Sequence, residues 1–161
     1  MLGSGHADAL WEVKAHPALT DAETGLATRL RFELVFNYLF QAGSRGMPFT
    51  VMLVSAGMQE DAPSEEVKVL GQAVEKTTRN SDLVCHVGNG RYVVLLFGTN
   101  LSGARLAADR IELALAPLAP GAISFGLAAY SNELENPRQL LDATDRALVA
   151  AEAAGGGVEF A

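Results

Sequence analysis

The side chains that could carry out chemistry are few, and their spacing matches no standard catalytic motif. The chain of 161 residues contains one cysteine and three histidines. Cys85 and His86 are adjacent in an apolar segment typical of a strand, so they point to opposite faces and cannot form a nucleophile–base pair. We expect one to face the core and the other the far side of the sheet. The zinc patterns CxxC and HExxH and the phosphate loop GxxxxGK(S/T) are absent, so we expect neither a metal nor a cofactor.

Composition excludes several other classes of protein. Hydrophobic residues make up 49% of the chain and charged residues 19%, which is typical of a globular domain. The net charge of −7 argues against sequence-independent binding of nucleic acid, which needs a basic surface. No apolar run approaches the roughly 20 residues of a membrane-spanning helix. A single cysteine excludes an internal disulfide and suits a cytoplasmic protein.

The sequence indicates one domain with a short leading segment. Residues 1–16 are expected to contain a short helix over 6–15, and the Gly-Ser-Gly tripeptide near the start resembles an artificial linker. Trp11 in this helix would anchor it on the domain or contact a second copy. Residues 17–161 are expected to form the domain itself.

Hydrophobic periods alternate between helix and strand along the domain. Stripes of apolar residues at helical spacing predict further helices over 26–41, from Pro63-Ser64 onward, over 101–116 and over 137–154. Continuous apolar runs predict buried strands over 48–57 and 121–130, and residues 156–160 indicate a short edge strand.

The clearest local signal is a β-hairpin. The apolar segments 83–88 (LVCHVG) and 91–98 (RYVVLLFG) flank Asn89-Gly90, the preferred pair for a two-residue turn with both residues at positive φ. Helical crossovers between the other strands favour a mixed sheet of about five strands with helices packed on it. A ferredoxin-like palm of the α/β (α+β) class is the simplest assembly.

Four short motifs together resemble the GGDEF domain, the diguanylate cyclase module of bacterial cyclic di-GMP signalling. They are DAETGLATR (21–29), NSDLVCHVGNGRYVVLLFGT (80–99), ISFGLAAY (123–130) and LLDATDRALVAAEAAG (140–155). Their order and spacing match the family, and the resemblance covers about 17–160. It implies a nucleotide-cyclase-like palm and a role in bacterial signal transduction.

The resemblance also implies that metal-binding carboxylates are missing. The signature reads Gly88-Asn89-Gly90-Arg91-Tyr92, with Arg91 where the family has a metal-binding carboxylate. A guanidinium cannot be a metal ligand. Ser55 and Gly57 stand where the family has two aspartates at the end of its first strand.

The residues that contact the nucleotide in the family differ as well. Glu152 replaces the lysine that meets the substrate phosphates, and Glu60 stands at a second lysine position. The segment between the first strand and the hairpin is shorter than in the family, so the loop that binds the guanine is expected to be absent. We expect Glu60 and Asp61 not to reach the site, and to lie with Glu65 and Glu66 on a solvated face. These departures together predict a degenerate, catalytically inactive domain.

One binding element of the family is retained. Arg79-Asn80-Ser81-Asp82 has the RxxD pattern of the family's inhibitory site (I-site) for cyclic di-GMP. Arginine can contact a phosphate or a guanine edge, and aspartate can accept from guanine N–H groups. The residues also have a structural interpretation, with Arg79 in the last turn of a helix and Asp82 accepting from a turn N–H. Both interpretations stay open.

The sequence therefore predicts a signalling module that is not an enzyme, with two functions open. The first is a regulatory module that receives cyclic di-GMP through Arg79 and Asp82. The second is a module for dimerisation or for binding a partner signalling protein, without a ligand. An active cyclase that converts GTP to cyclic di-GMP is the least favoured alternative. Asp21 and Arg29 are expected to form a cap and a structural ion pair outside either site.

Overall fold

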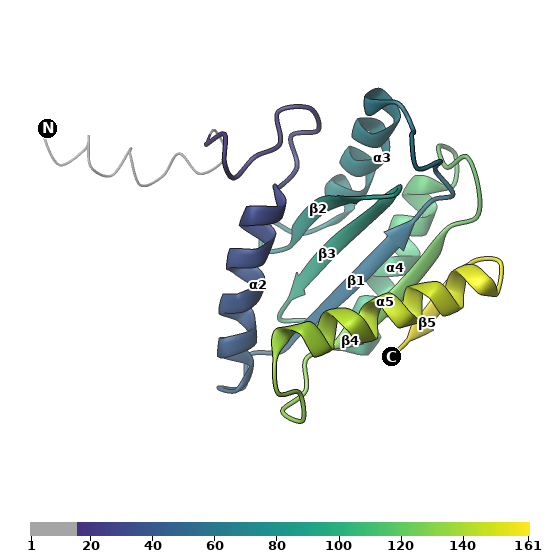
Figure 1. Cartoon of the computed structure of the whole chain (residues 1–161). Helices are drawn as coiled ribbons and strands as arrows, with labels where there is room; N and C mark the ends of the chain where they lie inside the picture. Colours follow the sequence, from purple (N-terminus) through teal and green to yellow (C-terminus); the bar gives the residue numbers. More distant parts are fainter. Residues whose placement is uncertain (1–15) are drawn as a thin grey trace, which may run out of the picture.

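A five-stranded sheet with helices on both faces makes up residues 16–161, the part of the chain that the computed structural model describes (Figure 1). The predicted helix over 6–15 and Trp11 lie outside these residues. The elements, in chain order, are α2 (Arg29–Gly43), β1 (Phe49–Ser55), α3 (Ser64–Thr77), β2 (Leu83–Gly88), β3 (Arg91–Phe97), α4 (Leu101–Leu115), β4 (Ser124–Ala129), α5 (Pro137–Ala153) and β5 (Gly157–Phe160).

The sheet is mixed, with the strand order β2-β3-β1-β4-β5. β1 pairs antiparallel with β3 and β4, and β2 pairs antiparallel with β3. β5 lies at one edge and pairs parallel with β4. These pairings confirm the predicted palm and its edge strand.

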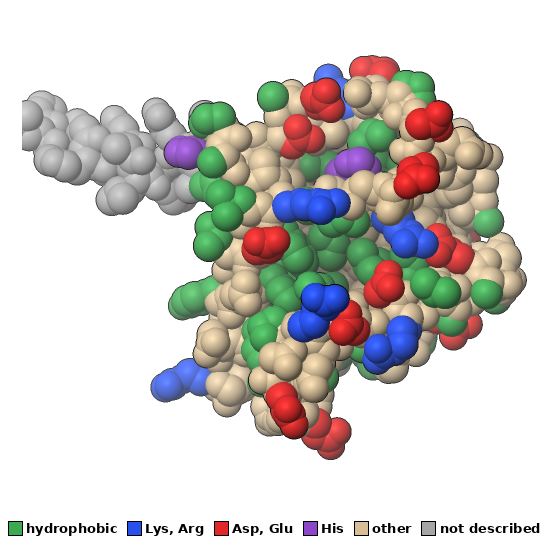
Figure 2. Space-filling model, viewed as in Figure 1, with side chains coloured by type: hydrophobic (Ala, Val, Ile, Leu, Met, Phe, Trp, Pro, Cys, Tyr) green, Lys and Arg blue, Asp and Glu red, His purple; other side chains and the backbone are tan. Residues whose placement is uncertain are grey.

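Two hydrophobic cores lie on opposite faces of the sheet. α3 and α4 cover one face, and α2 and α5 cover the other (Figure 1). Met52 and Val54 of β1 point into the first core, whereas Phe49 and Val51 point into the second. β1 is therefore buried on both faces, as its continuous apolar run predicts. Figure 2 looks onto the second face, where hydrophobic side chains show between α2 and α5.

The helix stripes lie where their spacing predicts, with small shifts at the ends of elements. Phe32, Phe36 and Leu39 of α2 are buried. α2 spans 29–43 instead of 26–41, because the Thr28 side chain caps it by accepting from the Arg31 N–H. β4 is shorter than the predicted strand over 121–130, because the Gly121 N–H bonds to the Ala56 carbonyl and not to the strand ladder.

The hairpin between β2 and β3 has the predicted two-residue turn. Asn89 has φ 53° and Gly90 has φ 68°, so both residues adopt the left-handed region that a type I′ turn requires. A register shift between His86 and Gly88 adds a bulge just before the turn, where Gly88 has φ 85°. The hairpin thus holds Arg91 at the start of β3, opposite the end of β1.

Candidate functional site

Three positions at which the chain departs from the GGDEF pattern contact one another. Ser55 at the end of β1 pairs with Arg91 at the start of β3, and Glu152 lies in the last turn of α5. Arg91 Nη2 donates to Glu152 Oε1 at 2.6 Å, and the Ser55 hydroxyl donates to Glu152 Oε2 at 3.0 Å. Both oxygens of the Glu152 carboxylate are therefore satisfied by protein groups. We call these residues the Arg91 cluster.

The backbone around Gly57 leaves no room for a carboxylate. Gly57 has φ 74°, a conformation that L side chains rarely adopt. A Cβ atom at this position would lie 2.5 Å from the Cα atom of Gly121. An aspartate here would require one of the two loops to move.

The Arg91 cluster borders a cavity of about 340 Å³, lined by Ser55, Gly57, Met58, Glu60, Asn89, Gly90, Arg91 and Glu152. The expectation that Glu60 would not reach this site is wrong, because the short loop after β1 turns back over the hairpin.

Acidic side chains gather along the upper edge of Figure 2, and Glu60, Asp61 and Glu65 are exposed. Within residues 16–161, no three His, Cys, Asp or Glu side chains gather closely enough to hold a metal ion.

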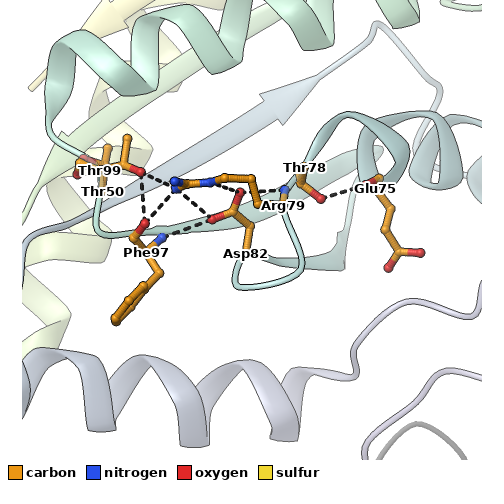
Figure 3. A network of polar contacts seen from close by, with 7 residues as sticks. All are labelled: Thr50, Glu75, Thr78, Arg79, Asp82, Phe97 and Thr99. Atoms are coloured by element: carbon orange, nitrogen blue, oxygen red, sulfur yellow. Dashed lines mark hydrogen bonds and ion pairs between the residues drawn. The ribbon is translucent and has the colours of Figure 1, made fainter.

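The RxxD motif forms a clasp between the α3–β2 turn and the end of β3 (Figure 3). Arg79 lies two residues beyond the end of α3 at Thr77, not in its last turn as expected. The Asp82 side chain is only 3% exposed. Its Oδ2 accepts from the Arg79 N–H at 2.9 Å, and its Oδ1 accepts from the Phe97 N–H at 3.2 Å. Asp82 thus accepts from a turn N–H, as its structural interpretation requires.

The guanidinium of Arg79 completes this clasp. It lies 3.4 Å from Asp82 Oδ1, and its Nη2 donates to the Phe97 carbonyl at 2.7 Å and to Thr99 Oγ1 at 2.6 Å (Figure 3). The Arg79 side chain nevertheless remains 57% exposed. Within the clasp, both carboxylate oxygens of Asp82 already accept hydrogen bonds, whereas part of the Arg79 guanidinium remains exposed to solvent.

A cavity of about 460 Å³ adjoins the clasp between the end of α3 and α4. Its polar lining includes Arg79, Thr99, Asn100 and Arg110, and we call it the Arg110 cavity. Sequence reasoning missed Arg110, because it lies in a helix and belongs to no short motif around Arg79. The available signal was its position three residues after the buried Ala107, which places both residues on the same face of α4.

Cys85 and His86 point to opposite faces of the sheet, as predicted. Cys85 is fully buried in the core under α2 and α5, and burial raises the pKa of its thiol to about 11, so it is not a nucleophile at neutral pH. His86 lies on the other side, with its ring 5.3 Å from the Tyr92 ring. Tyr92 is fully buried, and its hydroxyl donates to the Val67 carbonyl at 2.6 Å.

The environment of His86 makes stability depend on pH. Burial lowers its pKa below the usual 6.5, Asp21 partly opposes this effect, and Arg29 adds to it. Its Nε2 is buried without a hydrogen-bond partner among residues 16–161. In the pH interval between the folded and unfolded pKa values, the unfolded chain binds more protons, so stability rises with pH.

We therefore expect the free energy of unfolding to decrease as pH falls below about 6.5, the unfolded-state value for histidine. Replacing His86 by leucine should flatten this decrease, because leucine does not titrate. Urea unfolding between pH 7.5 and pH 5.5 measures the effect, with a substitution of the exposed His16 as control. An equal slope in wild type and His86→Leu would contradict the assignment.

Asp21 and Arg29 fulfil only half of what the sequence predicts. Asp21 closes its loop by accepting from the Glu23 N–H at 3.2 Å and from Thr24 Oγ1 at 2.8 Å. The expected ion pair is wrong, because Arg29 instead reaches across to the hairpin and donates to the Val87 carbonyl. This contact joins the start of α2 to β2.

Comparison with known proteins establishes the family. The sequence model described as "Diguanylate cyclase, GGDEF domain" matches residues 65–157, more than half of the chain. The chain therefore belongs to the GGDEF family, whose members are typically diguanylate cyclases of cyclic di-GMP signalling. No curated protein matches the sequence significantly. No helix in the described range is long and apolar enough to cross a membrane.

Solved structures agree on the fold. Diguanylate cyclase SiaD from Pseudomonas aeruginosa, in complex with its activator SiaC, superposes with a TM-score of 0.82 at 20% identity, covering 99% of this chain and 66% of that chain. The coiled coil and GGDEF domain of DgcB from Caulobacter crescentus, in complex with c-di-GMP, superposes with a TM-score of 0.80 at 17% identity, and the match covers 99% of both chains. The GGDEF domain of PA1120 (YfiN or TpbB) from Pseudomonas aeruginosa superposes with a TM-score of 0.75 at 20% identity, and the match covers 86% of this chain and 98% of that chain.

Proposed function

We propose that this GGDEF domain, residues 17–161, does not make cyclic di-GMP and acts as a regulatory module in the cytoplasm. The observation that carries the proposal is the Arg91 cluster. It places an ion pair where catalysis in the family requires metal ions and phosphates. Phosphoryl transfer depends almost entirely on positioning and on neutralising charge around metal-bound phosphates.

The three positions at which the family holds its metal ions supply no free oxygen donor in this chain. Arg91 is a cation, Gly57 has no side chain, and the Ser55 hydroxyl is committed to Glu152. A divalent cation such as Mg²⁺ requires oxygen ligands, usually carboxylates. Glu152 could supply one carboxylate only by giving up its pair with Arg91.

The phosphate side of the site has the wrong charge. Glu152 and Glu60 line the cavity where the family presents lysines, and Arg91 is the cation that balances Glu152. A nucleoside triphosphate would meet one unbalanced carboxylate and no free cation there. The connection from Ser55 to the start of α3 at Ser64 is also short, which supports the expected absence of the guanine-binding loop.

This proposal predicts that GTP does not bind in the presence of Mg²⁺ or Mn²⁺. A ligand that binds the folded state raises the melting temperature by mass action, so thermal unfolding with millimolar GTP and Mn²⁺ reports binding. We expect the same melting temperature with Mn²⁺ alone and with Mn²⁺ plus GTP. A rise that requires both would contradict the proposal.

A second candidate function is reception of cyclic di-GMP, and the Arg110 cavity favours it. The exposed part of Arg79 and the side chain of Arg110 line this cavity together with Asn100 at the N-terminus of α4. Arginine pairs with phosphate through strong, charge-assisted hydrogen bonds. The DgcB structure is a complex with c-di-GMP, which supports reception as a property to test in this chain.

Calorimetry with cyclic di-GMP tests the receptor function. Arg110→Gln should weaken binding about ten-fold or more, because an arginine–phosphate contact contributes about 1.5–3 kcal/mol. Arg110 is not part of the clasp, so this variant should keep its fold, whereas Arg79→Ala should weaken binding and also disturb the clasp. Arg105→Gln, on the same helix but paired with Asp109, is the matched control.

The result separates the two candidate roles. If the wild type does not bind cyclic di-GMP, the receptor function is refuted. The remaining function is then that of a module that binds a second copy of itself or a partner protein. The SiaD structure is a complex with its activator SiaC, so partner binding has a precedent among proteins of this fold.

A further inference from the structure

The outward face of α2 carries a row of exposed apolar side chains, Leu30, Leu34 and Tyr38, which we call the Leu34 stripe. These residues are 49%, 58% and 75% exposed, and their spacing of four residues places them in one row along the helix. The row points away from the core that buries Phe32 and Phe36. Figure 2 shows hydrophobic side chains along the left side of the molecule, where α2 lies. Because the outward face of a surface helix is normally polar, the stripe indicates a surface that another element covers.

The described part of the chain begins at the end of α2 where this stripe starts. Thr28, the N-cap of α2, holds the preceding loop in place. Its hydroxyl donates to the Ala18 carbonyl at 2.7 Å, and its N–H donates to the Leu19 carbonyl at 3.2 Å. Residue 16 is therefore tied close to the first turn of α2, which contains Leu30. Residues 1–15 precede this point, so they enter the domain beside the stripe.

The length of the preceding segment matches the length of the stripe. Leu30 and Tyr38 are eight residues apart in α2, which corresponds to about 12 Å at a rise of 1.5 Å per residue. The helix that the sequence predicts over 6–15 would be about 15 Å long by the same rise. Since this segment ends at the first turn of α2, a helix running antiparallel to α2 would span the whole stripe.

The residue types of the two surfaces are complementary. Ala7, Leu10 and Trp11 have the spacing of one apolar helix face, and Glu12 follows directly. Beside the stripe, Arg31 is half-buried, and its side chain makes no hydrogen bond or ion pair with any group among residues 16–161. In the antiparallel arrangement, Glu12 lies three residues before the end of the segment, level with the first turns of α2. A carboxylate there could pair with Arg31.

We propose that residues 6–15 dock as a helix on the Leu34 stripe of the same chain. Trp11 packs against Leu34 and Tyr38, and Glu12 pairs with Arg31. A tryptophan ring suits a shallow apolar row, because it covers a large apolar area while its N–H can stay in contact with water.

The occupant is this segment and not a second copy of the chain. A segment tethered next to its docking surface has an effective concentration of the order of millimolar, which a second copy at micromolar concentration does not match. Three exposed side chains also offer far less area than the roughly 800 Å² per partner that a stable protein–protein interface buries.

Fluorescence of Trp11, the one tryptophan in the chain, tests the proposal. A synthetic peptide of residues 1–15 provides the reference for an exposed indole. We expect the emission of the full chain to lie at shorter wavelength than that of the peptide, with acrylamide quenching at least two-fold weaker. The double variant Leu34→Gln/Tyr38→Gln should shift both values to those of the peptide. Arg31→Gln should shift them part of the way.

Leu113→Gln is the matched control, because Leu113 is 77% exposed on α4, outside the stripe. It should leave emission and quenching unchanged, and far-UV circular dichroism establishes that each variant is folded. The proposal is overturned if the wild type emits and is quenched like the peptide, or if the double variant behaves like Leu113→Gln. A blue shift that grows with protein concentration would also overturn it, because the contact would then be made by a second copy.

Discussion

Replacing Gly126 by alanine is expected to destabilise the domain by about 3 kcal/mol or more, the upper part of the range for overpacked cores. A Cβ atom at this position would lie 2.2 Å from the Leu148 nitrogen and 2.6 Å from the Thr144 carbonyl oxygen. Both atoms belong to the backbone of α5, so no side-chain rotation can relieve the contact. The helix would have to move away from β4 and open the core between them.

Urea unfolding of wild type and variant measures this effect. Gly103→Ala is the matched control, because its Cβ would meet only the Thr99 Cγ2 and Asn100 Oδ1 side-chain atoms, at 3.0 and 3.5 Å. Alanine also favours a helix over glycine by about 1 kcal/mol, so the control should be nearly neutral or slightly stabilising. A Gly126→Ala protein as stable as Gly103→Ala would contradict the close packing of α5 on β4.

Replacing Asp82 by alanine should destabilise the domain by about 1–3 kcal/mol, because the partly buried Phe97 N–H is left without an acceptor, whereas the exposed Arg79 N–H can bond to water. The change removes the acceptor of the Arg79 and Phe97 N–H groups at once. It also leaves the Arg79 guanidinium without its carboxylate, although the exposure of Arg79 limits that part of the loss. The α3–β2 turn would then no longer be tied to the end of β3.

Asp142→Ala provides the comparison for this prediction. Asp142 pairs with Arg138 at 3.0 Å on the surface of α5, where both side chains are at least 49% exposed. Removing such a pair should cost less than about 1 kcal/mol. If Asp82→Ala were no more destabilising than Asp142→Ala in chemical denaturation, the clasp would not be a structural element. Retention of the RxxD motif would then need a functional explanation alone.

Local physical signals made much of the fold predictable. The Asn89-Gly90 pair specifies its turn because both residues tolerate positive φ, and the turn fixes the pairing of the two flanking strands. The stripe of Phe32, Phe36 and Leu39 identifies the buried face of α2 from helical spacing alone. The apolar run in β1 indicates burial on both faces, which requires helices on each side of the sheet.

The contacts within the candidate site were less predictable, because they join residues far apart in the chain. The sequence alone shows each departure, at Ser55, Arg91 and Glu152. It does not show that the three side chains form one ion-paired cluster. Periodicity gives the face of an element but not the distance across loops. The expectation that Glu60 does not reach the site is wrong for that reason.

Arg29 and Arg110 show the same limit. Their helices were predicted, but the direction in which a long side chain reaches depends on the neighbouring element. The Val87 carbonyl that accepts from Arg29 lies 58 residues along the chain, and no local pattern links the two.

Formation of cyclic di-GMP from GTP tests the central claim most directly. The purified protein is incubated with GTP and Mg²⁺ or Mn²⁺, and the product is quantified by mass spectrometry beside an active GGDEF domain and a reaction without protein. Because Arg91, Ser55 and Gly57 supply no metal-binding carboxylate, we expect no product above the reaction without protein. Cyclic di-GMP that accumulates with time and in proportion to protein concentration would contradict the account.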